Sequence, residues 1–426
     1  MTAQAVPDGL TGSTGSTGSI ADPATFVAGP PFAEFARMRT QDPVSWVDEV
    51  SLTRRSAKGA AVQRVGGFWA VTRHAAVVAV SRNVEVFSSA ERGAFLTDPA
   101  SRADLERSRQ LLVGMDPPAH TKLRRVVTSA FTAALVRQMR ESIAEHARDI
   151  VRRAVSGEEI DAVVDVAAEL PLLVLADLLG IPREDRGLFL RWSNHLVGFD
   201  DPAYGGGDVE VFKQTFIEAF GYAIAAGKQK RRNPSDDLVS KLVVAEVDGR
   251  RLTEAEFCHL WLLLVVAGNE TTRHLISGGL DLLADRPDLA RRLSQRPDLV
   301  PGAVEEMLRW TTPIMQFRRT ALRDIEVEGK QIRAGDKVVL YYLSANRDEE
   351  VFADPDRFDP QRSPNPHLAF GIGPHFCLGS HLAKVEATIL FEELAGHLEG
   401  LRRRGPSVRL ESNFMNGLKQ LPIAFS

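Results

Sequence analysis

The chain has 426 residues, of which 44% are hydrophobic and 25% are charged, and its formal net charge at pH 7 is −4. A chain of this length can bury a large core, and length alone suggests two or three domains. The absence of a basic excess gives no indication of binding to nucleic acid or to an anionic membrane. The only two cysteines, Cys258 and Cys377, lie in different contexts. A disulfide framework is therefore not expected, a reducing cytoplasm is favoured, and Cys258 is predicted to be a packed core thiol.

The first 20 residues differ in character from the rest of the chain. They contain the repeat GSTGSTGS and lack the basic start and apolar centre of a signal peptide. We expect residues 1–20 to be a flexible, disordered tail. The longest strongly apolar run, Leu260–Ala267, is much shorter than the roughly 20 residues of a membrane-spanning helix, so no transmembrane segment is expected.

Residues 31–115 mix helical and strand patterns. An amphipathic helix is predicted over Phe32–Gln41, and a β-rich run over Phe68–Thr72 precedes a helix over His74–Ser81. This mixture favours a small sheet at the edge of a helical body. The segment Phe87–Met115 has no sustained periodicity, and a loop of that length is more often functional than idle. We interpret it as a candidate lid over a substrate.

A helix is predicted to begin near Ala119, after the proline pair of DPPAHTKLRRVV. His120 and Arg124 are four residues apart on it, so they share one face and can reach one anion together. A solvated pair on the helix surface is the alternative interpretation.

Between Ala133 and Asp285 nearly every segment has the pattern of an amphipathic helix. The clearest segments are Val163–Leu179, with a break or kink at Pro171, Arg186–Val197 and Val209–Lys230. The glycine-rich connection Gly198–Asp208 is expected to be mobile.

The long helix predicted over Thr253–Leu283 has an unusual centre, LLLVVAGNETTRHL. One stripe at helical spacing carries small side chains, which leave room for a flat bulky group and a small ligand; it consists of Leu264, Ala267 or Gly268, Thr271 and Leu275. Glu270 places an ionisable group beside the hydroxyl of Thr271 in an apolar span, where burial is costly without a role. Alternatively, Thr271 bonds back to a backbone carbonyl and bends the helix.

The pattern changes from helices to strands after Pro313. Helices are predicted over Pro287–Leu293 and Val300–Trp310, and the second carries Glu306-x-x-Arg309, a motif of low specificity. Arg319 lies a few residues before the predicted strands Ile325–Glu328, Gln331–Ile332 and Lys337–Tyr342. The chain ends in a predicted hairpin with Phe414 and Met415 at its tip.

The stretch His367–Glu386 contains the pattern F-x-x-G-x-H-x-C-x-G, formed by Phe370, Gly373, His375, Cys377 and Gly379, with Gly371 as a further small residue. A lone thiolate can be the proximal ligand of a haem iron. Gly373 and Gly379 would let the backbone bend around the sulfur. A helix predicted over Ser380–Leu390 places Cys377 just before a helix N-terminus, which favours an anion. Taken alone, Cys377 could instead be a small buried hydrophobe.

The cysteine pattern resembles the haem-ligating loop of the cytochrome P450 family, and four further motifs in the expected order extend the resemblance over nearly the whole chain beyond the tail. The sequence AGNET resembles the family's (A/G)-G-x-(D/E)-T oxygen-activation motif. The other likenesses are the propionate-binding pair His120 and Arg124, the structural pair Glu306 and Arg309, and the second propionate-binding arginine, which matches Arg319 better than Arg318.

The resemblance implies a single domain over residues 21–426, mainly α with a small β-rich lobe, and haem b bound between the long central helix and the cysteine-loop helix. It makes Cys377 the iron ligand. The implied haem-binding residues are His120, Arg124, Arg319, His375, Phe370, Gly371 and Gly379. The implied catalytic residues are Thr271, Glu270, Gly268 and Ala267. The implied substrate pocket contains Leu264, Val266, Ile314, Met315, Phe414 and Met415.

The resemblance also implies a cytoplasmic, monomeric monooxygenase that inserts one atom of O2 into a C–H bond of a small hydrophobic substrate. Electrons would come from a separate ferredoxin and an NAD(P)H-dependent ferredoxin reductase. The phrases VVAGNETTR, SANRDEEVF and PNPHLAFG are most similar to bacterial members that oxidise terpenoids, sterol side chains and branched lipids. Members acting on polyketides or carrier-bound amino acids are an alternative, and so are a haem sensor or carrier and a peroxide-driven enzyme, neither of which needs Glu270 and Thr271.

Overall fold

The computed structural model describes residues 18–57, 59–62, 66–156 and 159–425. Most of the predicted tail, residues 1–20, therefore lies outside the described residues. Its last residue, Ile20, is only 3% exposed and belongs to a hydrophobic cluster with Phe26 and Phe35. Packed structure is thus already present at Ile20, one residue before the predicted boundary at residue 21.

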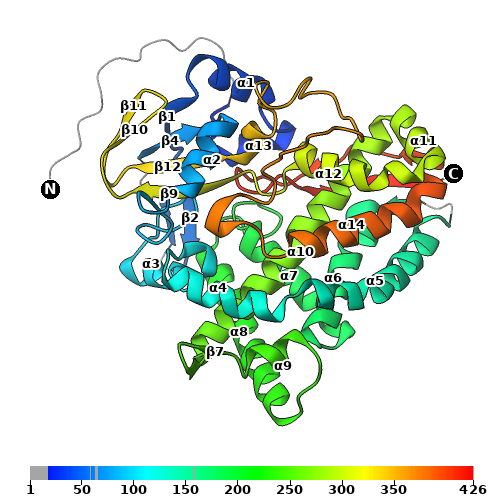
Figure 1. Ribbon diagram of the computed structural model, residues 1–426, viewed down its shortest axis with the longest axis horizontal. Coiled ribbons are helices and arrows are strands. Elements are labelled where there is room, and N and C mark those ends of the chain that lie inside the picture. The colour runs from blue at the N-terminus through cyan, green and yellow to red at the C-terminus, as the bar shows by residue number, and fades with distance from the viewer. Residues whose placement is uncertain (1–17, 58, 63–65, 157–158, 426) are drawn as a thin grey trace.

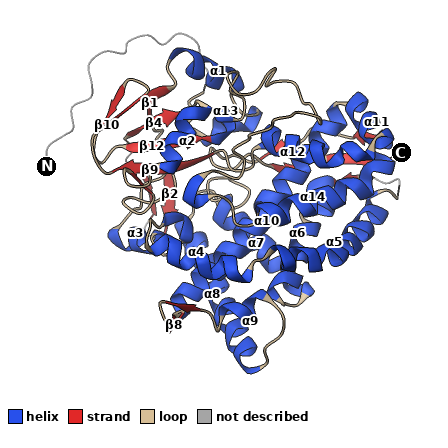
Figure 2. Cartoon of the chain, viewed as in Figure 1, coloured by secondary structure: helices blue, strands red, loops and turns tan. Residues whose placement is uncertain are grey.

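Helices make up most of the molecule, and most of the strands gather on one side of it, as Figure 2 shows. The predicted mainly α class with a small β-rich lobe is confirmed. In the described part of the chain, no helix has both the length and the hydropathy of a membrane span.

The largest sheet has five strands in the order β1-β4-β12-β9-β5, in which β12 runs parallel to β4 and antiparallel to β9. Its strands are β1 (Val44–Asp48), β4 (Gly67–Val71), β5 (Phe87–Ser88), β9 (Gln316–Ala321) and β12 (Lys337–Tyr341). Every residue of β12 is buried, as its continuous apolar run requires. Arg319, expected to precede the strands, in fact lies within β9.

The other strands form short pairs and one three-stranded sheet. They are β2 (Thr53–Ser56), β3 (Gly59–Val62), β6 (Ile160–Asp161), β7 (Glu246–Val247), β8 (Arg250–Arg251), β10 (Ile325–Val327), β11 (Lys330–Ile332), β13 (Leu401–Arg403), β14 (Val408–Arg409), β15 (Leu418–Gln420) and β16 (Pro422–Phe425).

Most helices agree with the predicted segments, because their apolar stripes are strongly periodic. The helices are α1 (Phe32–Gln41), α2 (His74–Arg82), α3 (Arg102–Ser108), α4 (Ala119–Ala130), α5 (Ala133–Ala154), α6 (Glu169–Leu179), α7 (Arg186–Val197), α8 (Val209–Arg232), α9 (Leu238–Leu242), α10 (Glu254–Asp285), α11 (Pro287–Gln295), α12 (Val300–Thr311), α13 (Tyr342–Ala345) and α14 (Ser380–Leu394). The exceptions are α13, which was not predicted, and α3, which lies within the segment Phe87–Met115 that was expected to be a loop.

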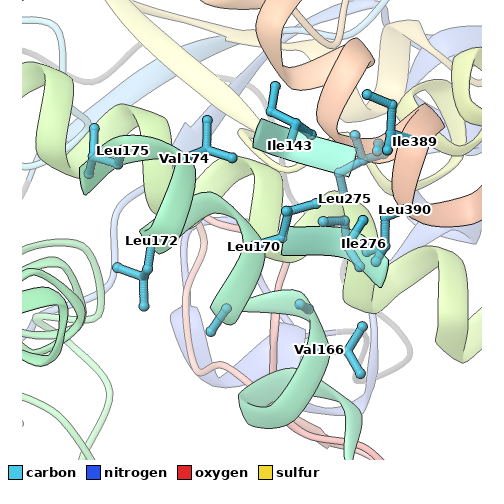
Figure 3. Close-up of a cluster of buried hydrophobic side chains, with 14 of the residues drawn as sticks. Ile143, Val166, Leu170, Leu172, Val174, Leu175, Leu275, Ile276, Ile389 and Leu390 are labelled. Carbon is cyan, nitrogen blue, oxygen red and sulfur yellow. The ribbon is translucent and has the colours of Figure 1, made fainter. Parts of the chain in front are cut away.

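The longest helix, α10, runs through the helical body and packs against α6, α7, α8, α12 and α14 (Figure 1). Thr253 caps its N-terminus and forms a capping box with Glu256, which satisfies two free backbone donors. Figure 3 shows side chains of α10, including Leu275 and Ile276, in one apolar cluster with Leu170 of α6 and Ile389 of α14. This packing fixes the rotation of α10, and with it the direction of each of its side chains.

Two predictions about local structure need correction. The break near Pro171 comes earlier, at Ala168, where a π-helical turn over Val163–Ala167 joins α6. Pro171 has no N–H to donate, so it is tolerated in the first turn of the new helix. The connection Gly198–Asp208, expected to be mobile, is anchored by the buried carboxylate of Asp201, which accepts hydrogen bonds from Lys419 Nζ at 2.8 Å and from Glu411 N at 2.8 Å.

Candidate active site

A largely apolar cavity lies between α10 and the cysteine segment that leads into α14. The two helices contact each other beside it (Figure 1). From α10 the cavity is lined by the predicted stripe of Leu264, Ala267, Gly268, Thr271 and Leu275. From the facing segment it is lined by Phe370, Gly371, His375, Cys377 and Gly379. The structure therefore brings together the two motifs that the sequence separates by about a hundred residues.

The backbone around Cys377 turns tightly, as predicted, but only some of the glycines are needed for the turn. Cys377 N donates to Phe370 O at 2.9 Å, which closes the loop. Gly373 has φ +76°, and a Cβ there would lie 2.9 Å from Ser81 O, so a larger residue does not fit. Gly379 has an ordinary φ of −86° and open space where its Cβ would be. Our prediction that Gly379 supplies the bend is wrong; its missing side chain leaves the cavity wall flat.

Two effects act on the sulfur of Cys377 in opposite directions. Burial raises the pKa of the Cys377 thiol, while the backbone N–H groups of Gly379 and Ser380 and the charge of Arg124 lower it. These N–H groups lie at the N-terminus of α14, where the helix dipole favours an anion. The loop therefore presents one sulfur to the cavity, with donors placed to stabilise a thiolate.

One edge of the cavity is basic, with three cationic or ionisable side chains, His120, Arg124 and His375, in its wall. The rings of His120 and His375 lie 4.3 Å apart, and both ring nitrogens of His120 are buried without a hydrogen-bond partner. Arg124 donates to Phe376 O at 2.5 Å, and no carboxylate of the described residues forms an ion pair with it. Burial and the nearby charges lower the pKa of His120 to about 4 and that of His375 to about 2. This edge is suited to an anionic group that accepts hydrogen bonds.

Arg319 is not among the residues that line the cavity, although the sequence predicted it there. Its guanidinium is buried and donates to Arg318 O at 2.7 Å. Its charge is still close enough to lower the pKa of His375. Arg319 therefore adds to the basic character of this edge from behind the wall.

The hydroxyl of Thr271 faces the cavity and donates to Ala267 O at 2.7 Å. The back-bond that we considered as an alternative is thus present. It uses the single hydroxyl proton and leaves the oxygen lone pairs free to accept a hydrogen bond from a molecule in the cavity. Both interpretations of Thr271 are compatible with this geometry.

Glu270 does not line the cavity, which corrects the prediction of a relay acid poised beside Thr271. Its side chain is 1% exposed, forms an ion pair with Arg273, and lies 3.4 Å from Nε2 of His274. Burial acts to raise the pKa of Glu270, but the charges and hydrogen bonds of Arg273 and His274 together outweigh it and hold the pKa below its usual range. Arg273 also donates to Asn194 of α7 at 2.9 Å. To act as a relay, the carboxylate would have to leave this cluster.

Glu386 of α14 is an acid at the cavity wall that the sequence analysis missed. It is 3% exposed, and its Oε2 has no hydrogen-bond partner. Burial alone raises the pKa of Glu386 to about 8, so the carboxyl is neutral at pH 7. Its position in the apolar stripe of a helix was a signal that could have identified it.

The pair Glu306 and Arg309 is fully buried and supports the segment before the cysteine loop, as predicted. Glu306 also accepts from Arg362 Nε at 3.0 Å, and Arg309 donates to the carbonyls of Asn346 and Pro355 at 2.9 Å. Because all these groups satisfy one another, removing one partner alone would leave a buried charge unpaired.

Only part of the predicted substrate pocket is correct. Leu264 and Ile314 line the cavity, whereas Val266, Met315, Phe414 and Met415 do not. Val266 is two residues after Leu264 and therefore points to the opposite side of α10. Met315 is fully buried in the cluster of Phe35 and Tyr341. Phe414 lies outside the wall, against Phe317, and Met415 pairs with Ile314 through the backbone.

Several lining residues were not predicted. They come from the loop before α4, from α6, from β9 and from α13, and include Leu112, Val113, Pro171, Val174, Leu175, Leu178, Phe317 and Tyr342. The helix α6 is apolar on nearly every side. Its sequence therefore cannot distinguish the face toward the cavity from the face toward the core.

These residues fit a haem. A single sulfur faces the cavity, flat walls at Ala267, Gly268 and Gly379 leave room for a planar ring, and the basic edge at His120 matches two propionates. The unpartnered nitrogens of His120 would gain hydrogen bonds from such a group, which removes the cost of leaving them buried without partners.

Comparison with known proteins agrees with this geometry. The family model described as Cytochrome P450 matches residues 295–399. The chain is 39% identical over 409 residues to a steroid C26-monooxygenase of Mycobacterium tuberculosis, covering 95% of this chain and 92% of that protein. It is 38% identical over 397 residues to a methyl-branched lipid omega-hydroxylase of Mycobacterium tuberculosis, covering 92% of this chain and 90% of that protein.

A solved structure is also similar over nearly the full chain. It is a cytochrome P450 of Mycobacterium marinum in complex with pseudoionone, with a TM-score of 0.85 and 40% sequence identity, covering 98% of this chain and 100% of that one. The arrangement of helices and sheets is therefore shared with this protein.

The buried acid Glu386 predicts a pH-dependent stability. The folded protein keeps this proton up to about pH 8, whereas an unfolded glutamic acid releases it near pH 4.5, so stability falls as pH rises between these values. We expect Glu386→Gln to abolish a slope of up to about 1.4 kcal/mol per pH unit in the free energy of unfolding. Urea denaturation at pH 5, 6, 7 and 8 measures it.

The control is Glu392→Gln on the exposed side of the same helix, which should keep the slope of the unsubstituted protein. Parallel pH profiles for the protein and Glu386→Gln would show that Glu386 is ionised in the fold.

Proposed function

This chain belongs to the cytochrome P450 family, and from that premise we propose that it hydroxylates a steroid, a terpenoid or a branched lipid. It is a bacterial-type monooxygenase with haem b as cofactor, which excludes the alternative of a non-catalytic haem sensor or carrier. We further propose a separate ferredoxin and an NAD(P)H-dependent reductase as electron donors, and the cytoplasm as its location.

The observation that best supports the proposed substrate class is the apolar lining of the cavity. Its lining residues from α6 are all apolar, and those from α10 are apolar except for Thr271 and Thr272 and the small Gly268. The one acid in the wall, Glu386, is neutral at pH 7 because burial raises its pKa to about 8. A charged substrate would lose its hydration here at a cost of several kcal/mol, whereas hydrocarbon gains roughly 25 cal/mol per Å² buried.

The names of the relatives support the same class. A steroid C26-monooxygenase and a methyl-branched lipid omega-hydroxylase are both described by oxidation at the end of a chain. We therefore propose a terminal or allylic carbon as the site of hydroxylation. A polyketide or a carrier-bound amino acid remains the alternative substrate.

The chain's own residues have distinct tasks in this proposal. The haem, when bound, supplies the oxidising chemistry that inserts one oxygen atom of O2 into a C–H bond. Cys377 Sγ would ligate the iron, while His120, Arg124 and His375 would hold the propionates. Thr271 Oγ1 accepts a hydrogen bond from a water in the cavity and so fixes the position of a proton donor. The apolar side chains exclude other water and orient the substrate.

The ligand prediction concerns Cys377. The dithionite-reduced protein with carbon monoxide should show the far red-shifted Soret band of thiolate ligation, because the sulfur donates charge to the iron. Cys377→His should lose this band, and Cys258→Ala, which removes the buried thiol of α10, should keep it. A globin-like spectrum of the unsubstituted protein would contradict the assignment.

Thr271 is expected to control the coupling of NADH oxidation to product. Removing its hydroxyl takes away the acceptor that positions a proton-donating water, which typically costs about 10²–10⁴ in the step concerned. Thr271→Ala should therefore bind substrate nearly as before, while product per NADH falls and hydrogen peroxide accumulates. Thr271→Ser, which keeps the hydroxyl, should stay largely coupled. If Thr271→Ala gives the same yield of product per NADH as the unsubstituted protein, the role of Thr271 is purely structural.

The substrate class is tested by a spectral titration of the purified haem protein. We expect a low-spin to high-spin shift with a steroid, a terpenoid and a branched fatty acid, because apolar ligands displace water from the cavity. A free amino acid and a sugar serve as polar comparisons. If only the polar compounds shift the spectrum, the proposed class is wrong although the family is right.

A further inference from the structure

Three phenylalanine rings from separate parts of the chain meet in a closed triangle. Phe95 comes from the loop after β5, Phe317 from β9, and Phe414 from the turn between β14 and β15. Their ring centroids are 6.1 Å apart for Phe95 and Phe317, 5.5 Å for Phe95 and Phe414, and 5.6 Å for Phe317 and Phe414. All three pairs are tilted or edge-to-face, the arrangement that aromatic rings prefer.

The triangle extends from the cavity to the solvent. Phe317 lines the cavity beside Tyr342, whose ring centroid is 6.4 Å away. Phe95 is 37% exposed, although its neighbours Ala94 and Leu96 are buried at 0% and 8%. Phe414 is half-buried against both other rings. The three rings therefore connect the cavity wall at Phe317 with the molecular surface at Phe95.

The backbone on both sides of Phe95 is tied to the central sheet. Ala94 O accepts from Arg318 N at 2.9 Å, and Leu96 O accepts from Lys337 Nζ at 3.0 Å. These bonds hold the loop against β9 and β12, so the direction of the Phe95 ring is set by the sheet rather than by the loop itself.

Buried charges strengthen this attachment. The carboxylate of Asp98 contacts Arg318 Nη1 at 2.6 Å and Lys337 Nζ at 3.0 Å, and Lys337 is also paired with Glu49. Arg318 and Lys337 are only 1% and 7% exposed. Both cations are therefore held by carboxylates, and the loss of the Asp98 charge would leave Arg318 without an acidic partner among the described residues.

The other two rings are held by their backbones. Phe317 lies within β9, and Met315 N donates to Phe414 O at 2.9 Å. Phe414 N also donates to Ser412 Oγ at 3.1 Å. Phe95 is thus the most exposed of the three rings and the one whose loop depends on the buried cations Arg318 and Lys337. It is the ring that can move when a molecule passes.

We propose that Phe95, Phe317 and Phe414 form an aromatic entrance that selects the apolar molecules reaching the cavity, with Phe95 as a specificity-determining residue and Asp98 as the positioning residue that holds it. The proposal rests on the proposed function in so far as the cavity receives the substrate. The three rings of the entrance admit the narrow apolar end of a molecule, because C–H groups of that molecule can replace the contacts between the rings. They slow the passage of a wider molecule.

The experiment follows the entry and exit of two haem-iron ligands by stopped-flow absorbance on the haem-loaded protein. The probes are imidazole, which is small, and 4-phenylimidazole, which adds an apolar ring. Both bind through the imidazole nitrogen, so the test holds whatever the natural substrate is. If no lipid of the substrate panel binds, the proposed substrate class fails and this measurement still decides the entrance.

We expect Phe95→Ala to raise the association and dissociation rates of 4-phenylimidazole about three- to tenfold, because Phe95 forms two of the three ring pairs and a single aromatic pair contributes roughly a factor of two to ten. The rates of imidazole should change less than twofold, and the equilibrium constant of either ligand should change little. Phe95→Leu, which keeps an apolar side chain without the ring, should act in the same direction.

Asp98→Asn should shift the rates of 4-phenylimidazole in the same direction with haem content unchanged, and Asp98→Glu, which keeps the charge, should restore them. The matched control is Trp46→Ala, because Trp46 is 38% exposed and also forms an edge-to-face pair, with Trp69, on the same sheet but is not part of the cavity wall. Rates of 4-phenylimidazole within twofold of the unsubstituted protein in both Phe95→Ala and Phe95→Leu would overturn the proposal, as would equal changes for both probes.

Discussion

The position of Cys377 depends on the buried pair of Glu306 and Arg309, because this pair fixes the irregular segment that leads to the cysteine loop. Arg309 binds the carbonyls of Asn346 and Pro355, and Asn346 Oδ1 in turn accepts from Leu368 N at 2.6 Å. Two residues later, Phe370 O accepts from Cys377 N. These hydrogen bonds and the short stretches of chain between them thus connect α12 with the backbone of Cys377. Breaking a fully buried pair by removing one partner typically costs about 3–5 kcal/mol of stability. The pair of Glu306 and Arg309 therefore both stabilises the fold and positions the cysteine loop.

Much of the fold could be predicted from the sequence because helical periodicity is strong over α1, α7 and α10. The strand β9 was missed for a physical reason. Arg318 and Arg319 lie within it, and their charges hide the apolar pattern that would indicate a buried strand. Their burial depends on partners such as Asp98 that are distant in the sequence. Local patterns cannot contain that information.

The candidate site shows the same limit at the level of single residues. The stripe from Leu264 to Thr271 was predictable because its residues share one face of a straight helix. The direction of the Glu270 side chain could not be predicted, because it depends on how α10 is rotated about its own axis in the fold. One signal was available, because Arg273 follows Glu270 by three residues, a spacing at which a helix forms ion pairs. The helical spacing also shows that Val266 cannot lie on the face that lines the cavity, because it lies about 200° around the helix from Leu264.

The two buried acids Glu270 and Glu386 show how the surroundings set the charge state of the same kind of side chain. Glu270 has Arg273 beside it and stays ionised, which ties α10 to Asn194 of α7. Glu386 has only burial, which raises its pKa to about 8 and keeps it neutral at pH 7. The first acid is charged but faces away from the cavity, and the second faces the cavity but carries its proton. Glu386 therefore carries a proton at the cavity wall, whereas Glu270 can reach the cavity only if its bond to Arg273 opens. For Glu270, a role in proton supply would therefore require the separation of a buried ion pair, which is costly.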